Sequence, residues 1–364
     1  MKIDKSKLNV IGIDRIVLND IDILNFDTLD FDIVNDEKEQ KKQIKIKDEF
    51  FKLFYSRNIN KNTGEIYNTS LLEFNPIKIY YGHNIYNSDI KQLERGLNYI
   101  KETLSIKGIK IDFSKSKIKE IELNITIAQN FIEFSEIFEL IGSANHKSAL
   151  SISSFLNKDI PKEMVRTRTL YLNPLGSKKS SGKTIKIYDK TYELMQSREM
   201  FIEEELTRVE ILLGSNFLKS MLKKNGLSND LKDFTNDDII EKIYKESLVK
   251  EFVIKPMNYI ENLKKDLRYK FKNFKRNEKV KREYREKLKA QGKEIPEEYK
   301  EERGVFEYLK KESWIFDACL LSEIVQKEVS TKDRKAYQIQ IEKKYKNIKN
   351  FSIYKDFLKK VKVL

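Results

Sequence analysis

The sequence predicts an α+β fold: an antiparallel-rich sheet with helices on one face, followed by a mostly α-helical C-terminal region. Three observations predict it. Segments of strand-like alternation recur through the first two thirds of the chain, and helical patterns separate several of them. After about Leu213 the alternation stops and long charged helical stretches follow. We therefore expect an α/β domain at residues 1–215 and a helical, basic accessory region at residues 216–364.

The expected strands share an apolar–polar period of two residues, which is typical of strands with one buried face. The pattern is clearest in KIKEIELNITIA, from Lys117 to Ala128. In chain order, the expected strands are Leu8–Val17, Leu72–Tyr81, Lys117–Ala128, Thr167–Leu172, Thr184–Tyr188 and Leu206–Leu213.

The expected helices have apolar residues three and four positions apart. Asp89–Leu104 aligns its isoleucines and leucines on one face, with Ser88 as its expected N-cap. The other expected helices are Asn130–Ile141, Leu263–Lys289 and the amphipathic Trp314–Val329, with Lys293–Glu302 as a linker.

Composition restricts the kinds of site that the chain can carry. A net charge of +14, from 71 basic and 57 acidic residues, favours a polyanionic partner. The single cysteine, Cys319, excludes an internal disulfide and Cys-rich zinc sites. The only histidines, His83 and His146, are too far apart in sequence for an HExxH site or the paired-histidine motif of the best-known relaxases. No signal peptide or long apolar run is evident, so we expect a soluble cytoplasmic protein without membrane association.

The segment Leu263–Lys289 concentrates positive charge, with 13 basic and 4 acidic residues and aromatic side chains between them. Such a helix either faces nucleic acid or presents a solvated, lysine-rich surface. Because the excess is of one sign, we favour the first interpretation. The candidate DNA contacts on this helix are Lys272, Lys275, Arg276 and Lys279.

A lysine- and serine-rich loop leads into a strand that ends at Tyr188. If Ile185 and Ile187 face the core, Lys186 and Tyr188 share the opposite face with Lys190. Nearby ammonium groups stabilise a phenolate, and a phenolate beside phosphate-binding lysines suits attack on a phosphodiester. The alternative is that this tyrosine only packs. The candidate nucleic-acid contacts near this strand are Lys178, Lys179, Lys183 and Lys186.

Two further strands carry polar residues on one face. Glu122 and Asn124 lie two residues apart in IELNIT, and Arg208 and Glu210 lie two apart in LTRVEI. Carboxylate and amide oxygens are ligands for Mg²⁺ or Mn²⁺, so Glu122, Asn124 and Glu210 are candidate metal ligands. The alternative is that they face solvent. His83 lies between Gly82 and Asn84 in an expected turn, either as a structural hydrogen-bonding residue or as a contact to DNA.

Four segments resemble, in order, the phage/plasmid replication protein II/X family, which contains the gene II-like rolling-circle initiators of filamentous phages. They are NPIKIYYGHNIYNSDI at Asn75–Ile90, IELNIT at Ile121–Thr126, the stretch Thr169–Leu194 around the Tyr-x-Lys motif, and LTRVEILLGSNFLKSML at Leu206–Leu222. Two positions depart from the family pattern. Glu122–Asn124 stands where the family has Arg-x-Asp, and Thr207 interrupts the usual Leu-Arg.

The resemblance implies a rolling-circle DNA replication initiator that nicks and religates one strand at an origin, through a 5′-phosphotyrosine intermediate and a free 3′-hydroxyl. Carried over by position, the nucleophile is Tyr188, with Lys190 and Arg208 as catalytic residues and Tyr192 as the competing or second nucleophile. The implied cofactor is Mg²⁺ or Mn²⁺. The implied partners are duplex and single-stranded origin DNA, a host helicase and polymerase, and a second copy of the chain in a homodimer.

Two other function classes compete with this one. A non-catalytic basic DNA- or RNA-binding protein would use Tyr188 to stack on a base. A tyrosine recombinase is disfavoured because two isolated histidines cannot supply its Arg/His constellation. The sequence has no GxxxxGK[ST] loop, which agrees with religation driven by the phosphotyrosine bond instead of ATP.

Overall fold

The computed structural model describes most of the chain. The described residues are 3–29, 34–36, 39–41, 43–60, 62–145, 169–172, 182–198, 200–234, 236–300, 326–327, 331, 334–335, 338–339 and 352–364. Of the sequence-based expectations, Lys178, Lys179, His146, Cys319 and nearly all of the Trp314–Val329 helix lie outside these residues.

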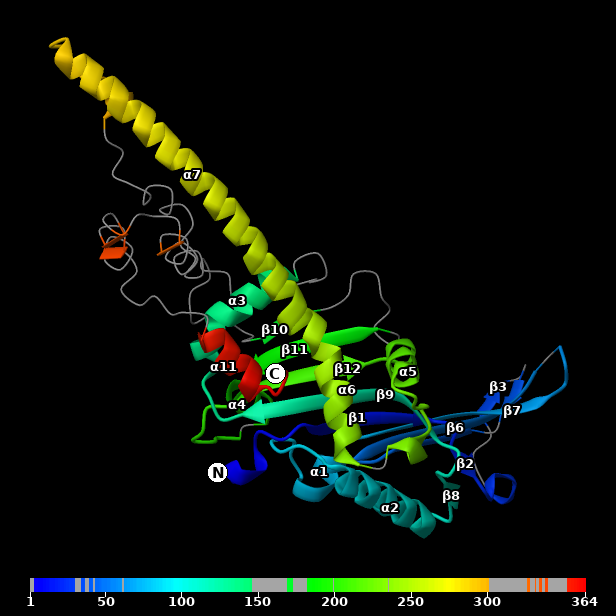
Figure 1. Ribbon diagram of the computed structural model, residues 1–364. Helices are drawn as coiled ribbons and strands as arrows, with labels where there is room; N and C mark the ends of the chain where they lie inside the picture. Colours follow the sequence, from blue (N-terminus) through cyan, green and yellow to red (C-terminus); the bar gives the residue numbers. More distant parts are fainter. Residues whose placement is uncertain are drawn as a thin grey trace. The chain divides into compact units, whose positions relative to one another are not determined.

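An eight-stranded sheet forms the centre of the fold, with strand order β10-β11-β12-β9-β1-β7-β6-β5 (Figure 1). Every neighbouring pair is antiparallel. Its strands are β1 (Gly12–Asn19), β5 (Gln43–Lys47), β6 (Phe51–Ile59), β7 (Ile66–Phe74), β9 (Lys117–Ile127), β10 (Thr169–Leu172), β11 (Lys183–Asp189) and β12 (Thr207–Leu213). Two small antiparallel pairs accompany it, β2 (Asp22–Ile23) with β8 (Ile111–Asp112) and β3 (Val34–Asp36) with β4 (Glu39–Lys41).

Helices connect the strands and make up the described C-terminal part. They are α1 (Pro76–Tyr81), α2 (Ile90–Ile106), α3 (Ser135–Ala144), α4 (Lys190–Arg198), α5 (Ser215–Lys224), α6 (Asp237–Val249), α7 (Lys255–Ala290) and α11 (Ser352–Lys360). Single turns of 3-10 helix are η1 (Lys5–Lys7), η2 (Phe26–Thr28), η3 (Phe131–Phe134), η6 (Leu231–Asp233) and η8 (Glu297–Tyr299), and η7 (Lys250–Ile254) is a π-helical turn. The predicted α+β class, with a large antiparallel sheet and a helical C-terminal region, is confirmed.

The sheet has one apolar and one polar face. Ile125, Val209 and Ile187 lie in register across β9, β12 and β11, and each is fully buried. Helix α6 packs over this apolar face. Lys183 extends from the same face of β11 and donates a hydrogen bond to the main-chain carbonyl of Ser247, in α6, at 2.7 Å. On the other face, Asn124, Glu210 and Lys186 lie in register. The alternation that builds the core therefore also gathers the polar side chains.

One predicted strand, Leu72–Tyr81, is wrong in its second half. β7 ends at Phe74, and α1 begins at Pro76. The Asn75 side chain accepts a hydrogen bond from the Lys78 amide at 3.0 Å and so caps α1, and proline favours the first helical turn. Gly82 ends the helix with a left-handed φ of 69°.

Other boundaries shift by a few residues, and two strands of the eight-stranded sheet were not predicted. The N-cap of α2 is Asp89 and not Ser88, with a capping box between Asp89 and Gln92. The first predicted strand begins at Gly12 and not at Leu8, since Lys5–Lys7 form a short 3-10 turn. The hairpin partners β5 and β6 are additional strands.

The chain divides into two compact units. One comprises residues 1–250 with 360–363, and the other comprises residues 251–359 with 364. The expected boundary after residue 215 lies inside the first unit, because α5 and α6 pack on the sheet. The candidate site lies wholly in this first unit.

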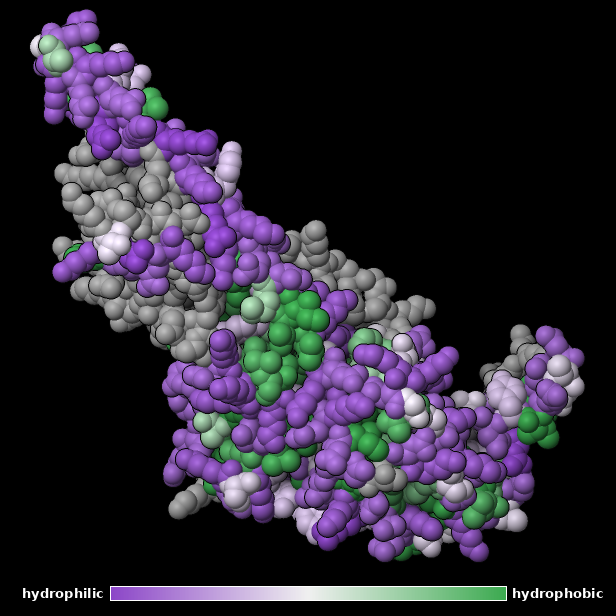
Figure 2. Space-filling view, viewed as in Figure 1, coloured by the Kyte–Doolittle hydropathy of each residue, from purple (hydrophilic) through white to green (hydrophobic). Residues whose placement is uncertain are grey.

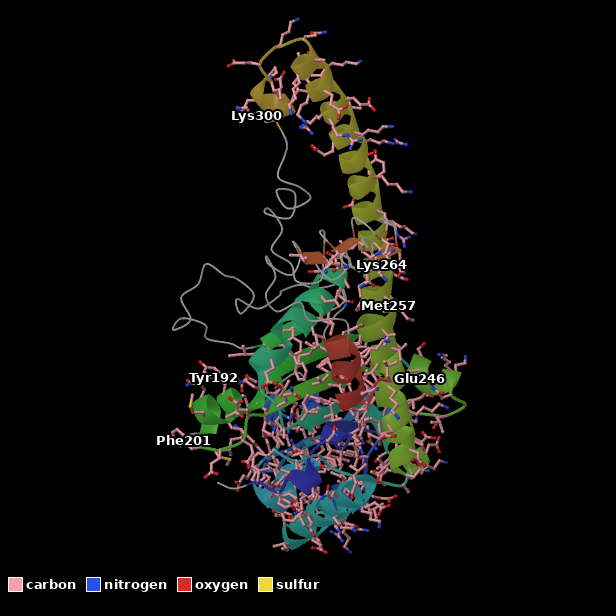
Figure 3. The ribbon with its side chains drawn as sticks, turned by 60° about the vertical axis from the view of Figure 1, so that its left-hand side comes forward. Tyr192, Phe201, Glu246, Met257, Lys264 and Lys300 are labelled. Carbon is pink, nitrogen blue, oxygen red and sulfur yellow. The ribbon has the colours of Figure 1, made fainter. Side chains whose placement is uncertain are left out.

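Helix α7, in the second unit, is the longest described helix at 36 residues. Its surface in Figure 2 is hydrophilic along nearly all of its length, with isolated apolar side chains. Figure 3 shows many side chains with nitrogen or oxygen at their ends along α7 beyond Lys264. Among the described helices, none is long and apolar enough to cross a membrane.

Candidate functional site

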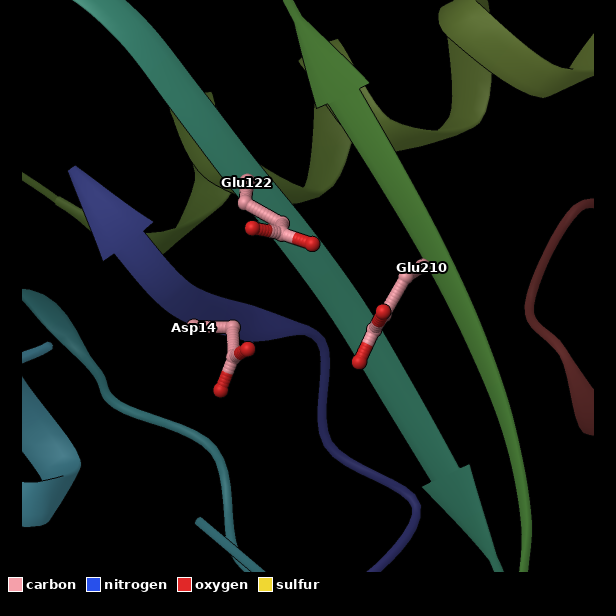
Figure 4. A group of neighbouring side chains, drawn as sticks. All are labelled: Asp14, Glu122 and Glu210. Atoms are coloured by element: carbon pink, nitrogen blue, oxygen red, sulfur yellow. The ribbon is translucent and has the colours of Figure 1, made fainter. Parts of the chain in front are cut away.

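Three carboxylates from three neighbouring strands meet on the polar face of the sheet. Asp14 comes from β1, Glu122 from β9 and Glu210 from β12, and each offers an oxygen within 4.8 Å of the others. Their side chains point toward one another in front of the strands (Figure 4). Three clustered carboxylates repel one another unless a cation or a proton neutralises them.

Asp14 lies at an irregularity in β1. Ile13 pairs with Leu123 and Arg15 with Glu122, so the register shifts between them and Asp14 is the extra residue. The β-bulge allows two consecutive residues, Asp14 and Arg15, to face the same polar side beside Glu122. Asp14 was not among the candidate ligands predicted from the sequence, because the alternation of one strand does not show that β1 lies next to β9.

Tyr188 lies beside the cluster. Its hydroxyl donates a hydrogen bond to Glu210 Oε1, and its side chain is only 3% exposed. Lys186 Nζ lies 3.9 Å from the ring centroid and Lys190 Nζ lies 5.7 Å from it. Burial, followed by the charge of Glu210, raises the pKa of Tyr188 well above its ordinary value. The tyrosine is therefore protonated here, contrary to the expectation that its lysine neighbours would favour the phenolate.

Two buried cations complete the polar network. Lys190, fully buried at the start of α4, donates to Glu193 Oε2 at 2.7 Å and to Asn84 Oδ1 at 3.1 Å. Burial, and then the charge of Arg208, lowers the pKa of Lys190 to about 8. Near neutral pH its ammonium is thus a much better proton donor than an ordinary lysine.

Arg208, also fully buried, connects the cluster to its surroundings. One guanidinium nitrogen lies 3.6 Å from Asp14 Oδ1 and 3.7 Å from Glu210 Oε1. Its Nε donates to Thr126 Oγ1 at 2.8 Å, and its other nitrogen donates to the carbonyls of Asn84 and Ile85. Arg208 therefore offsets part of the negative charge and holds the loop at residues 84–85 against the sheet.

The pKa of Glu122 reflects the crowding of the three carboxylates. Burial, followed by the charges of Glu210 and Asp14, raises the pKa of Glu122 from its ordinary value to about 7. Arg15, whose Nε lies 3.1 Å from Glu122 Oε2, only partly opposes this rise. In the absence of a metal ion, the cluster holds a proton up to about neutral pH.

Asn124 lies next to the carboxylates and supplies an independent test of whether a cation fits. It pairs in register with Glu210, and its side chain is fully buried. Neither its amide oxygen nor its amide nitrogen has a hydrogen-bond partner among the described residues. A buried amide is rarely left unpaired, and its oxygen is a suitable hard ligand. Three carboxylates with this amide oxygen form a donor set that could hold a divalent metal ion.

The remaining residues predicted from the sequence are distributed unevenly. Lys186 lies on the polar face, with Nζ 3.4 Å from Glu210 Oε2. Lys183 lies on the apolar face and contacts α6, as described above. Its odd position, against the even positions of Lys186 and Tyr188, is the sequence signal that separates it from them.

His83 is buried, and it helps to fix the loop that follows α1. Its Nδ1 accepts a hydrogen bond from the Ile85 amide at 3.3 Å, and its ring stacks on Tyr81. This arrangement agrees with the structural alternative considered for His83.

Tyr192 lies on α4 (Figure 3), where its amide donates to Asp189 Oδ1 at 2.9 Å. Together with Phe131 and Met195 it lines a cavity of about 280 Å³, whose lining includes none of the three clustered carboxylates. The basic residues Lys272, Lys275, Arg276 and Lys279 belong to α7, in the second unit.

No family model matches the sequence, and the search of curated proteins returns no match. Among solved structures, the chain is similar to the rolling circle replication initiator protein from Geobacillus stearothermophilus. The identity is 12%, the TM-score is 0.32, and the similarity covers 66% of this chain and 84% of that one.

Proposed function

We propose that the protein is a metal-dependent DNA nickase–ligase that starts rolling-circle replication at an origin, with Tyr188 as its nucleophile. The observation that carries the proposal is the hydrogen bond between Tyr188 and Glu210. It joins a tyrosine to a cluster of three carboxylates, beside two buried cations. A tyrosine with only a packing role would need none of these neighbours.

In the proposed reaction the Tyr188 oxygen attacks a backbone phosphorus. A bond forms between that oxygen and phosphorus, the bond from phosphorus to the 3′-oxygen breaks, and the products are a 5′-phosphotyrosine and a 3′-hydroxyl. The hydroxyl proton of Tyr188 already faces Glu210, which is the acceptor that the geometry favours. Religation reverses these steps without ATP, because the phosphotyrosine bond retains the phosphodiester's energy.

Lys190 and Arg208 provide positive charge close to the nucleophile. We assign them to the non-bridging oxygens of the phosphate, where charge grows as the bonds change. With its pKa lowered to about 8, Lys190 is also suited to protonate the departing 3′-oxygen. Since Tyr188 is almost fully buried, binding of DNA must expose its hydroxyl to the scissile phosphate while Glu210 stays within reach as the proton acceptor.

Asp14, Glu122 and Glu210, with Asn124, would hold the metal ion, and Mg²⁺ or Mn²⁺ suits these oxygen donors. When bound, such an ion supplies positive charge that polarises the scissile phosphate and stabilises the departing oxygen. The residues then have separate tasks: the carboxylates hold the cation, Tyr188 attacks, and the buried cations balance the phosphate.

The second candidate function is non-catalytic binding of DNA or RNA, which the basic helix α7 favours by itself. The deciding experiment incubates the full chain with supercoiled origin DNA, or with a single-stranded oligonucleotide from it, in Mg²⁺ or Mn²⁺. The covalent adduct is trapped by denaturation and mapped by peptide mass spectrometry.

We expect a 5′-phosphotyrosine adduct on Tyr188 that does not form when EDTA is present during the reaction. An adduct on Tyr192 would move the nucleophile to α4. DNA binding without nicking or adduct, on the cognate origin, would establish the binding protein instead. Full nicking in EDTA would remove the metal ion from the mechanism.

A further inference from the structure

Two asparagine amides from the segment between β7 and α2 converge on one carboxylate of the site. Asn75 Nδ2 donates to Asp14 Oδ1 at 3.2 Å, and Asn84 Nδ2 donates to the same oxygen at 3.5 Å. The positively charged guanidinium of Arg208 makes a third contact with Oδ1, at 3.6 Å. Asp14 Oδ2 takes none of these contacts, so it is the oxygen left for a cation.

We propose that Asn75 and Asn84 are positioning residues for Asp14. By saturating Oδ1, they fix the rotation of the carboxylate and keep Oδ2 directed to the ion shared with Glu122 and Glu210. Outer hydrogen-bond partners of this kind orient metal ligands and commonly change metal affinity 10- to 100-fold. This inference rests on the metal-binding part of the proposed function and does not depend on the nucleophile.

Asp14 needs such support because it is the extra residue of a β-bulge. A bulged residue has no regular cross-strand partner to limit its side chain, so its direction must be set by other contacts. Both asparagines are themselves held in place and about 9% exposed. Asn75 Oδ1 caps α1, and Asn84 Oδ1 accepts from the buried Lys190.

Asn84 further connects the two ends of the site. Its side chain bridges Asp14 and Lys190, and its carbonyl accepts from Arg208. The loop approaches β1 so closely that a Cβ on Gly12 would lie 2.6 Å from the Ser88 carbonyl oxygen. Gly12 thus permits the close contact that brings Asn84 within reach of Asp14.

The test measures Mn²⁺ binding to the full chain by titration calorimetry, without DNA. Asn84→Ala and Asn75→Ser remove the two amides, and serine still caps α1. The matched control is Asn87→Ala, in the same loop, whose amide nitrogen donates to the main-chain carbonyls of Val10 and Asn124 and, among the described residues, to no carboxylate of the cluster. Thermal melting checks that each variant is folded.

We expect each of the two variants to weaken Mn²⁺ binding roughly tenfold, with the control within twofold of the wild type. In an Asp14→Ala background, Asn84→Ala should cause no further loss, because the carboxylate it positions is gone. Wild-type affinity in Asn84→Ala and Asn75→Ser would overturn the inference. So would an equal loss in the Asn87→Ala control, or a loss that adds fully to that of Asp14→Ala.

These results are independent of nicking. If the wild type binds Mn²⁺ and the variants behave as expected but no adduct forms on DNA, the positioning role stands and the nickase fails. If an adduct forms but the wild type binds no Mn²⁺, the positioning role fails and the tyrosine chemistry stands.

Discussion

The Tyr188 hydroxyl on β11 donates to Glu210 Oε1 on the neighbouring strand β12. The Glu210 carboxylate also belongs to the three-carboxylate cluster and forms ion pairs with Arg208 and Lys186. The tyrosine and the carboxylate cluster are thus coupled through one side chain. A metal ion bound by Glu210 would compete with the Tyr188 hydroxyl for the carboxylate oxygens. The hydrogen bond of Tyr188 should therefore differ between the metal-free and the metal-bound protein.

The first prediction concerns Tyr188→Phe, which removes one oxygen atom and one hydrogen bond. The loss of that bond should change the free energy of unfolding by only about 1 kcal/mol, since Arg208 and Lys186 still neutralise Glu210. Covalent adduct formation should be abolished while DNA affinity stays near wild type. Tyr192→Phe is the matched control and should form the adduct normally. Undiminished nicking by Tyr188→Phe would contradict the proposed nucleophile.

The second prediction separates the catalytic role of Lys190 from its structural one by the variant Lys190→Met. Methionine fills a similar volume without charge, but it leaves Glu193 and Asn84 Oδ1 without the ammonium that they contact, so the variant should lose some stability. We expect a folded protein with a lower melting temperature, unchanged DNA affinity, and cleavage slowed about 10²- to 10³-fold. Single-turnover kinetics on a short single-stranded substrate measure the rate. Wild-type cleavage by a folded Lys190→Met protein would leave this ammonium with a structural role only.

The sequence pattern predicted the strand positions of the site well. A period of two placed Lys186 with Tyr188 on one face, and Glu122 with Asn124, and the strand register then aligned Asn124, Glu210 and Lys186. These positions are predictable because hydrophobic burial of the opposite face enforces the alternation over whole strands.

The rest of the site depends on contacts that the sequence does not display. Asp14 joins the cluster because β1 pairs with β9, and Asn84 reaches it from a loop that folds back over Gly12. The strand prediction at Asn75 instead missed a local signal, since an N-cap and a proline start a helix there within an apolar stretch. Burial also reversed the expected effect of the lysines on the pKa of Tyr188, because desolvation outweighs their charge.

The third prediction is a pH dependence of stability in the metal-free protein. The pKa of Glu122 is raised to about 7, so between its ordinary value near 4.5 and pH 7 the folded protein binds more protons than the unfolded one. Stability therefore falls as pH rises through this range, by at most about 3 kcal/mol. Denaturant unfolding in EDTA between pH 5 and pH 8 measures it.

Glu122→Gln should remove most of this slope, because the amide cannot ionise. Added Mn²⁺ should stabilise the wild type more at pH 8 than at pH 5, since binding requires the deprotonated carboxylates. A wild-type slope that Glu122→Gln leaves unchanged would show that this carboxylate is not the group responsible.

The fourth prediction concerns the basic helix α7. Replacing Lys272, Lys275, Arg276 and Lys279 by alanine should weaken duplex binding, and each lost phosphate contact should lower the log–log salt slope by about 0.9. Cleavage of a short single strand should change little, because the site lies in the other unit. The charge-matched control replaces four exposed lysines on and after α2, namely Lys91, Lys101, Lys107 and Lys110. Equal salt slopes for both variants would indicate that α7 is a solvated surface.

The last prediction exploits the unpaired amide of Asn124. In the metal-free protein this buried group has lost its hydrogen bonds to water and gained none from the described residues, which destabilises the fold by about 1–3 kcal/mol. Asn124→Leu replaces it with an apolar side chain of similar size, so the variant should be more stable than the wild type in EDTA. The same variant lacks the amide oxygen and should bind Mn²⁺ more weakly. A residue kept as a metal ligand lowers the stability of the metal-free protein and raises its affinity for the ion, whereas a structural residue raises stability. A higher melting temperature in EDTA together with weaker Mn²⁺ binding would therefore identify Asn124 as a ligand. A variant that is less stable in EDTA, or one that binds Mn²⁺ as tightly as the wild type, would exclude Asn124 from the metal site.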